Sequence, residues 1–173
     1  MHYTQTISSP LGNILLSADE VGLTGLWFDG GRYYAETLPE EHVERETPIL
    51  MDTKRWLDVY FTGREPDFTP PLHPAGSAFR MTIWRLLLQI PYGQTTTYGE
   101  LAKRLECGRM SAQAVGGAVG HNPISIIVPC HRVVGANGSL TGYAGGLDRK
   151  IRLLEIEQTD MHGLFRPKKG TAI

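Results

Sequence analysis

The chain has 173 residues, of which 41% are hydrophobic, and this length allows one ordinary domain or two small ones. Its formal net charge is −1, and its two cysteines exclude both a disulfide scaffold and a cysteine-rich zinc site. Because no stretch has the apolar length of a membrane span and the N-terminus lacks a signal pattern, we expect a soluble, cytoplasmic protein with no membrane partner.

The charges are distributed unevenly along the chain. Residues 1–76 carry five Lys and Arg against 12 Asp and Glu, a net of −7. Residues 77–158 carry nine against five, a net of +4, and residues 159–173 carry three against one, a net of +2. A polyanion would therefore bind the second half of the chain, although a charge of +4 is also within ordinary surface variation.

Residues 1–63 are predicted to form a small α/β domain with a structural role. Turn residues separate three predicted strands, over residues 2–8, 13–18 and 22–28. Residues 48–62 repeat apolar side chains at helical spacing, with Pro48 suited to the first turn and Gly63 to the cap. The polar, acidic segment 32–47 shows no clear periodicity and is expected to be a loop or an irregular helix.

Residues 64–76 contain four prolines and are expected to form an extended linker. Beyond it, Ser77 is suited to cap a helix that runs to about Ile90. The run Thr97-Tyr98-Gly99-Glu100 has the form of a capping box, which would open a short helix ending near Leu105.

Ser111 is suited to cap the next helix, over residues 112–119, and two short helices joined by a brief turn suggest a helix-turn-helix. This second helix is built mainly from Ala and Gly, so another backbone could approach it closely. The partner is either a nucleic-acid groove or a neighbouring protein segment. Since only Gln113 could reach base edges, the helix suits a shallow or minor groove better than the major groove.

The apolar run 126–128 predicts a short buried strand that ends at Pro129, so Cys130 would lie where a strand opens into a loop. His131 could take the thiol proton, and a thiolate is a nucleophile. On an extended chain the two side chains would point to opposite faces, so a bridging water or a sharp turn would have to connect them. From Cys130 alone, an inert core cysteine is the commoner alternative.

The last third of the domain has a turn at Asn137-Gly138, a glycine-rich loop at 142–146 and a helix over residues 147–157. Glu157 falls at the border of the apolar face of that helix. If it is buried, it needs a partner, for which His131 is a candidate; spacing alone would favour a surface glutamate. Residues 159–173 are expected to be a tail.

Three separated motifs together resemble the O6-alkylguanine-DNA alkyltransferases, also called methylated-DNA–protein-cysteine methyltransferases. They are Asn122-Pro123-Ile124-Ser125, Pro129-Cys130-His131-Arg132-Val133-Val134-Gly135 and Gly142-Tyr143-Ala144-Gly145-Gly146. The resemblance is specific over residues 79–157 and looser over 1–76. It implies an α/β N-terminal domain, a small antiparallel sheet plus helix, followed by a mainly α, helix-turn-helix (winged-helix-like) C-terminal domain.

The resemblance also implies a mechanism. Cys130 would accept the alkyl group of O6-alkylguanine, and of O4-alkylthymine, irreversibly and once per molecule, without a cofactor or a metal. His131 would deprotonate Cys130 through a water, and Glu157 would orient His131. Asn122 would hydrogen-bond the backbone of the active-site turn, and Tyr98 would donate a proton toward the departing guanine.

The implied partner is double-stranded DNA, bound through its minor groove by a monomer, with the alkylated base flipped out of the stack. The expected DNA and substrate contacts lie on the helix 112–119, in the cysteine motif and in the loop that follows: Ala112, Gln113, Ala114, Gly116, Val119, Arg132, Val133, Tyr143, Ala144 and Gly145.

Two residues depart from the family pattern. Gln113 stands where the family often has an intercalating arginine, and it brings no charge, which would lower duplex affinity or its salt dependence. Ala144 stands where some members have serine and removes one possible hydrogen bond to the base. Some members bind zinc through N-terminal cysteines, but residues 1–106 contain no cysteine, so no such site is expected.

Three other functions are weighed against the alkyltransferase. A non-catalytic sensor of alkylated DNA would lack the acceptor cysteine, which this chain has. A helix-turn-helix regulator that senses alkylation or oxidation at Cys130 would bind a specific duplex sequence as a dimer, and no dimerisation element is evident. A Cys–His hydrolase would need an oxyanion motif, and none is apparent in the sequence.

Overall fold

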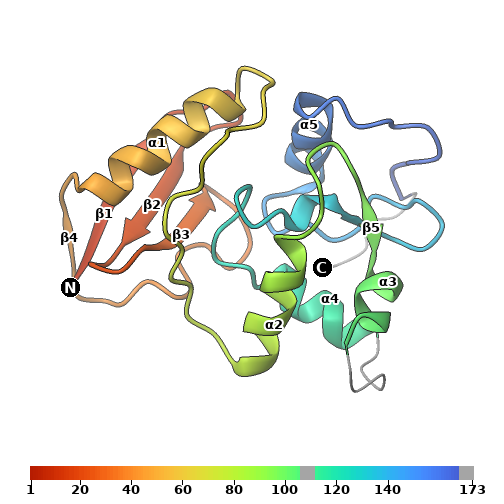
Figure 1. Ribbon diagram of the computed structural model, residues 1–173, viewed down its shortest axis with the longest axis horizontal. Coiled ribbons are helices and arrows are strands. Elements are labelled where there is room, and N and C mark those ends of the chain that lie inside the picture. Colours follow the sequence, from red (N-terminus) through yellow and green to blue (C-terminus); the bar gives the residue numbers. More distant parts are fainter. Residues whose placement is uncertain (106–111, 168–173) are drawn as a thin grey trace.

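The computed structural model describes residues 1–105 and 112–167. An N-terminal sheet covered by one helix lies beside a C-terminal group of helices, as Figure 1 shows. This arrangement confirms the fold class predicted from the sequence.

The three predicted N-terminal strands are present as β1 (His2–Ile7), β2 (Ile14–Ala18) and β3 (Leu23–Phe28). They pair antiparallel in a four-stranded sheet of order β3-β2-β1-β4. Helix α1 (Pro48–Tyr60) packs on this sheet, and Thr47 caps it by accepting a hydrogen bond from Leu50 N at 3.3 Å.

The segment 32–47 holds no helix. It contains a series of turns and a fourth strand, β4 (His42–Glu44), which pairs parallel to β1 at the edge of the sheet. All three residues of β4 are exposed, so the strand is held by backbone hydrogen bonds rather than by an apolar face. A strand of this kind leaves no hydrophobic period in the sequence.

The proline-rich segment 64–76 is extended, as predicted, and runs along the free edge of β3. Leu23 N donates to Pro71 O and His73 N donates to Leu23 O, both at 2.7 Å. The segment therefore covers part of an edge strand that would otherwise present unpaired backbone groups. The domain boundaries on either side of it remain a prediction.

The predicted C-terminal helices are present as α2 (Ala78–Leu87), α3 (Tyr98–Lys103), α4 (Ala112–Gly120) and α5 (Leu147–Ile156). Ser77 and Thr97 cap α2 and α3 as expected, while the cap predicted at Ser111 lies outside the described residues. A pair of short parallel strands, β5 (Thr96–Thr97) and β6 (Val133–Val134), was not predicted.

The strand predicted over residues 126–128 is wrong. These residues are buried, but the chain from Ile124 folds into compact turns in which Val128 N donates to Ile124 O at 3.1 Å and Ile126 has a φ of 70°. β-Branched, buried residues indicated a strand because both features are typical of sheet interiors. The partner for the backbone is instead the side chain of Asn122.

Residues 159–167, predicted to be a tail, fold back onto the turn at Asn137-Gly138. Phe165 N donates to Gly138 O at 3.1 Å, and Leu140 N donates to Phe165 O at 2.8 Å. Residues 168–173 lie outside the described part of the chain. Within residues 1–105 and 112–167, no helix is long and apolar enough to cross a bilayer.

One buried hydrophobic cluster runs through both halves, from the sheet and α1 to α2 and α4. Trp84 on α2 lies in it and donates its indole N–H to Ala118 O on α4 at 2.9 Å. α4 is thereby fixed to α2 by a hydrogen bond as well as by packing.

We predict that Trp84→Phe destabilises the protein by roughly 2–3 kcal/mol, since it removes a buried donor and leaves a small cavity. Trp56→Phe is the matched control, because Trp56 is also buried but makes no hydrogen bond among the described residues. Urea unfolding monitored by circular dichroism measures both. Equal losses in the two variants would show that the hydrogen bond to α4 contributes nothing.

Candidate active site

Cys130 begins a single 3-10 turn, η1 (Cys130–Arg132), that directly follows the compact turns 124–128. Its side chain is buried, with 5% of the residue exposed, and its N–H donates to Val128 O at 2.8 Å. Burial raises the pKa of the Cys130 thiol, an effect that the Asn122 side chain and the charge of Lys150 only partly offset. At neutral pH the thiol is therefore protonated, and it needs a base to become a nucleophile.

Asn122 holds the backbone in front of Cys130. Its Nδ2 donates to Val128 O at 2.8 Å and to Ile124 O at 3.3 Å, and its Oδ1 accepts from Ile124 N at 3.0 Å. All of these groups are buried. One amide side chain thus replaces a neighbouring strand and fixes where the turn presents the thiol.

Glu157 lies at the C-terminal end of α5 and is 2% exposed. Its Oε2 accepts from His131 Nε2 at 2.5 Å and from the Tyr60 hydroxyl at 2.6 Å. Its Oε1 accepts from Arg132 Nε at 2.8 Å and from Gly93 N at 3.1 Å. Burial alone would raise the pKa of this carboxyl, but the hydrogen bonds from His131 and Arg132 and the positive charge of Arg132 outweigh it and hold the pKa at about 2.

The contact between Glu157 and His131 confirms the pairing suggested by the sequence, and it fixes the state of the imidazole. Burial lowers the pKa of His131, more than the hydrogen bond and charge of Glu157 raise it, so the ring is neutral at neutral pH. Because Glu157 can only accept, the single ring proton is on Nε2. His131 Nδ1 is then a buried acceptor, and it has no partner among the described residues.

Cys130 and His131 share the turn η1 instead of an extended chain, so the chain makes the sharp turn that was considered from the sequence. The orphaned Nδ1 can take a proton from the thiol, either directly or through one water. Such a chain of nucleophile, base and orienting carboxylate is the arrangement required for nucleophilic catalysis.

Lys150 is a buried cation near this turn that the sequence analysis missed. It is 0% exposed, and its Nζ donates to Val133 O and Thr141 O, both at 2.6 Å. Burial lowers its pKa to about 8, against an opposing pull from the Cys130 thiolate. The burial of Lys150 could have been predicted from the sequence, because this residue falls on the same helical face as Leu147, Ile151 and Leu154.

Tyr60 was also missed as a site residue. It was counted among the apolar residues of α1, and its hydroxyl reaches Glu157 across 97 positions of sequence. Burial and the neighbouring carboxylate raise its pKa far above the ordinary value, so it remains a donor. No local pattern indicates a contact of this range.

A groove of about 590 Å³ lies between α4 and the segment 141–142. Its walls come from three elements: Tyr98, Ala112, Gln113, Gly116, Gly117, Thr141 and Gly142. Ala112 and Gln113 are exposed, as a DNA-contacting surface requires. Tyr98 donates to Thr141 O at 3.3 Å, and burial together with the charge of Cys130 raises its pKa to about 12, so it carries a proton at neutral pH. Gly117, Thr141 and Gly142 were not predicted.

Three expected DNA contacts are placed elsewhere. Val119 is 1% exposed and belongs to the core, so its assignment as a contact was wrong. Arg132 is 8% exposed, and its guanidinium donates hydrogen bonds to Glu157 and, at 2.6 Å, to Ile90 O. It does not line the groove. Val133 O already accepts from Lys150. These contacts were expected from the family resemblance, which does not show which side chains of a motif point inward.

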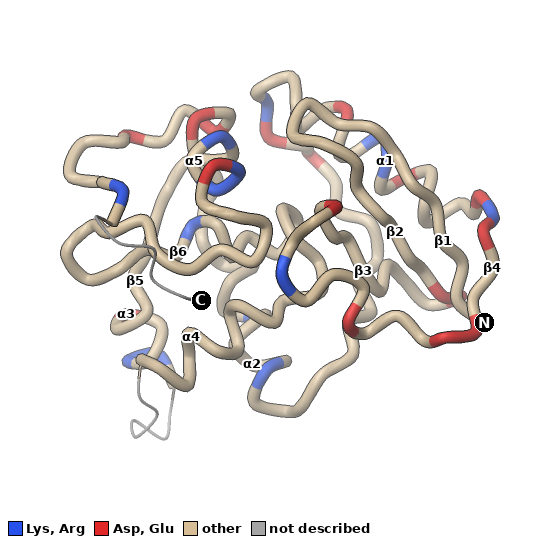
Figure 2. Tube along the Cα trace, turned by 180° about the vertical axis from the view of Figure 1, so that it is seen from behind, with Lys and Arg blue, Asp and Glu red and all other residues tan. Residues whose placement is uncertain are grey.

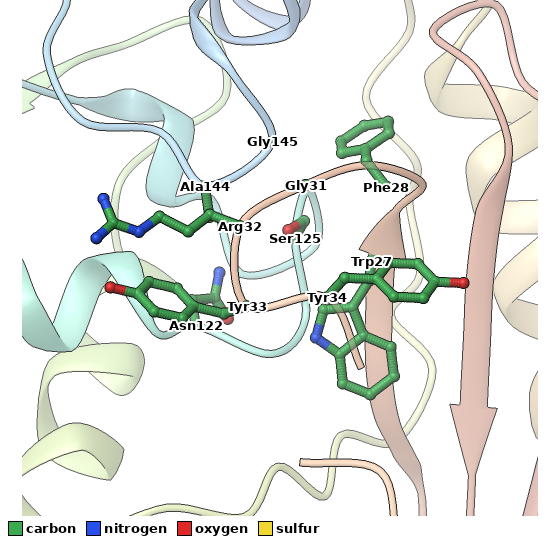
Figure 3. Close-up of a pocket in the computed structure, with 10 residues that line it drawn as sticks. All are labelled: Trp27, Phe28, Gly31, Arg32, Tyr33, Tyr34, Asn122, Ser125, Ala144 and Gly145. Atoms are coloured by element: carbon green, nitrogen blue, oxygen red, sulfur yellow. The ribbon is translucent and has the colours of Figure 1, made fainter. Parts of the chain in front are cut away.

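Of the remaining predicted residues, Ala114 and Gly116 are partly exposed on α4, and Tyr143 is buried beside His131 with its ring centroid 6.4 Å away. Ala144 and Gly145 line a small pocket against the N-terminal half, which Figure 3 shows. Within the described part of the chain, no three His, Cys, Asp or Glu side chains gather as metal ligands would.

The charges follow the predicted division of the chain. Figure 2 shows acidic residues gathered near the N-terminus and β4, whereas basic residues lie on α2 and near α3 and β6. The groove beside α4 is thus on the basic half of the chain.

Two family models together cover nearly the whole chain. Residues 1–74 match the ribonuclease-like domain, and residues 78–159 the DNA binding domain, of 6-O-methylguanine DNA methyltransferase.

Individual relatives agree. The methylated-DNA–protein-cysteine methyltransferase of Methanosarcina acetivorans is 47% identical over 155 residues, which cover 90% of this chain and 97% of the relative. The crystal structure of Mycobacterium tuberculosis OGT in complex with DNA is similar with a TM-score of 0.80 and 40% identity, covering 90% of this chain and 92% of that one. An O6-methylguanine DNA methyltransferase from Methanococcus jannaschii has a TM-score of 0.64 at 28% identity, covering 96% and 99%.

The carboxylate of Glu157 predicts an acid-dependent stability. Its pKa is about 2 in the folded protein against an ordinary 4.5, so it stabilises the fold fully above about pH 4.5, and this contribution is lost as the pH falls toward 2. We predict that Glu157→Gln costs on the order of 3 kcal/mol at neutral pH and that its deficit shrinks across this window.

Chemical unfolding of both proteins at a series of pH values measures the deficit. Tyr60→Phe is the control, because it removes one donor to Glu157 but keeps the carboxylate and therefore keeps the acid-dependent loss. If the loss of unfolding free energy in Glu157→Gln does not change between pH 4.5 and 2, the low pKa assigned to Glu157 is wrong.

Proposed function

The chain belongs to the 6-O-methylguanine DNA methyltransferase family and is a DNA repair alkyltransferase, and we propose that Cys130 is the residue that accepts the alkyl group. One observation carries this assignment. The buried Cys130 thiol shares a turn with a neutral His131 whose Nε2–H is held by Glu157 and whose Nδ1 has no partner among the described residues. A protonated thiol and an available base thus belong to one short turn, which supports the proposal.

In the proposed step the thiol proton moves to His131 Nδ1, directly or through one water. The Cys130 sulfur then attacks the alkyl carbon on O6 of guanine, forming an S–C bond as the C–O bond breaks. The electron pair of that bond leaves with the guanine, toward which Tyr98 donates a proton. A thioether does not hydrolyse under ordinary conditions, so each molecule reacts once.

The alkylated base must leave the duplex to meet a buried thiol. We assign to this entry the groove between α4 and residues 141–142, because Tyr98, Gln113 and Thr141 line it and the charge of Cys130 acts on the Tyr98 hydroxyl. O4-alkylthymine presents the same alkyl–oxygen bond and is proposed as a second substrate. We further propose that the protein acts as a cytoplasmic monomer.

We predict that wild-type protein gains the mass of one methyl group when mixed with excess duplex containing O6-methylguanine, with no further gain at longer times. Intact-protein mass spectrometry followed by peptide mapping measures this. The added mass is expected on Cys130, with Cys107 in the same digest as an internal control thiol. Cys130→Ala should bind the duplex without any gain. Methylation of that variant, or of Cys107 in the wild type, would overturn the assignment.

We also predict that Gln113→Arg strengthens duplex binding and steepens its salt dependence, because an exposed residue of the groove gains one phosphate-directed charge. The slope of log affinity against log salt concentration should steepen by about 0.9. Gln89→Arg adds the same charge at an exposed position outside the groove and serves as the control. If both variants change the slope equally, the charge acts through the overall field and not through the groove.

A further inference from the structure

The segment 31–36, between β3 and β4, leaves the N-terminal sheet and contacts the loop that follows the active-site turn. Arg32 N donates to Ala144 O at 2.7 Å. Gly31 lies so near that a Cβ on it would be 3.2 Å from the same oxygen. Figure 3 shows this segment opposite Ala144 and Gly145, with Asn122 and Ser125 in the same pocket.

The same segment holds the end of α4. The Tyr33 ring stacks on the His121 ring with centroids 3.8 Å apart and planes inclined by 27°. His121 Nδ1 lies 2.9 Å from Glu36 Oε2, and the Arg32 guanidinium lies 5.1 Å from the centroid of Tyr33. His121 is continuous with α4, because its N–H donates to Gly117 O at 3.1 Å.

Tyr33 and Ala35 adopt left-handed backbone conformations, with φ values of 61° and 53°. For residues with a Cβ, such conformations are strained and persist only where the surroundings impose them. A connection that merely joined two strands could adopt an unstrained path. The stack on His121 and the hydrogen bond to Ala144 are the contacts that hold this path in place.

We propose that residues 31–36 are a positioning element for alkyl transfer, with Tyr33 acting through His121 as its central residue. The segment joins the end of α4 to the loop 142–146, and α4 and the start of that loop are the two walls of the groove through which a flipped nucleotide has to pass. It thereby fixes the spacing of those walls when duplex DNA is bound. This inference rests on the proposed function of the groove and extends it to the N-terminal half.

The experiment compares two substrates in single-turnover reactions: duplex DNA containing O6-methylguanine, and free O6-methylguanine base. Tyr33→Ala should slow transfer from the duplex on the order of tenfold, because misplacement of α4 by a fraction of an ångström is felt at the reacting atoms. Transfer from the free base, which needs the thiol but no docked helix, should stay within about twofold of the wild type.

Tyr33→Phe keeps the stacking ring and should restore the duplex rate, which would show that the ring and not the hydroxyl is required. Met51→Ala, at an exposed position on α1 outside this segment and outside the groove, is the control and should leave both rates unchanged. Glu36→Gln weakens the contact to His121 with little effect on folding, and it should slow only the duplex reaction even if Tyr33→Ala does not fold.

Duplex transfer at the wild-type rate in both Glu36→Gln and Tyr33→Ala would overturn the proposal, as would equal losses with both substrates. Failure of the proposed function is a separate outcome, because it would appear as no transfer by the wild-type protein itself.

Discussion

The buried carboxylate of Glu157 is the constraint on which the site depends. Removing such a charge from water costs several kcal/mol, and only full pairing offsets this. Its four donors come from α1, from the turn after α2 and from η1, so one carboxylate joins the N-terminal half to the acceptor turn. The N-terminal half, expected to be only structural, therefore supplies Tyr60 to the network that orients His131.

The same carboxylate determines the chemistry available to Cys130. By accepting from His131 Nε2 it leaves Nδ1 as the free base, and by its low pKa it remains charged and can stabilise the imidazolium formed when the thiol loses its proton. Lys150 adds a second buried positive charge, held by the carbonyls of Val133 and Thr141. The imidazolium of His131 and the charge of Lys150 therefore both stabilise the Cys130 thiolate, whose formation burial alone would disfavour.

Much of the fold was predictable because it depends on local pattern. The first three strands, α1 and the caps at Ser77 and Thr97 follow from turn residues, helical spacing and capping residues. The turns at 124–128 were not, because a side chain, Asn122, takes the role of a partner strand. β4 has no apolar face to indicate it. Cys130, His131, Asn122 and Glu157 were found through motif resemblance. Tyr60 is brought in by a tertiary contact that no spacing encodes, whereas the burial of Lys150 on the apolar face of α5 could have been predicted from helical spacing.

Whether Glu157 fixes His131 as a neutral base with Nδ1 as the acceptor is tested by nitrogen-15 NMR of the His131 ring in the resting protein between about pH 7 and pH 8. The account predicts a single protonated nitrogen, Nε2, throughout this range, because burial lowers the pKa of the imidazole. An imidazolium, or a neutral ring protonated on Nδ1, would contradict it, since neither could accept the Cys130 proton.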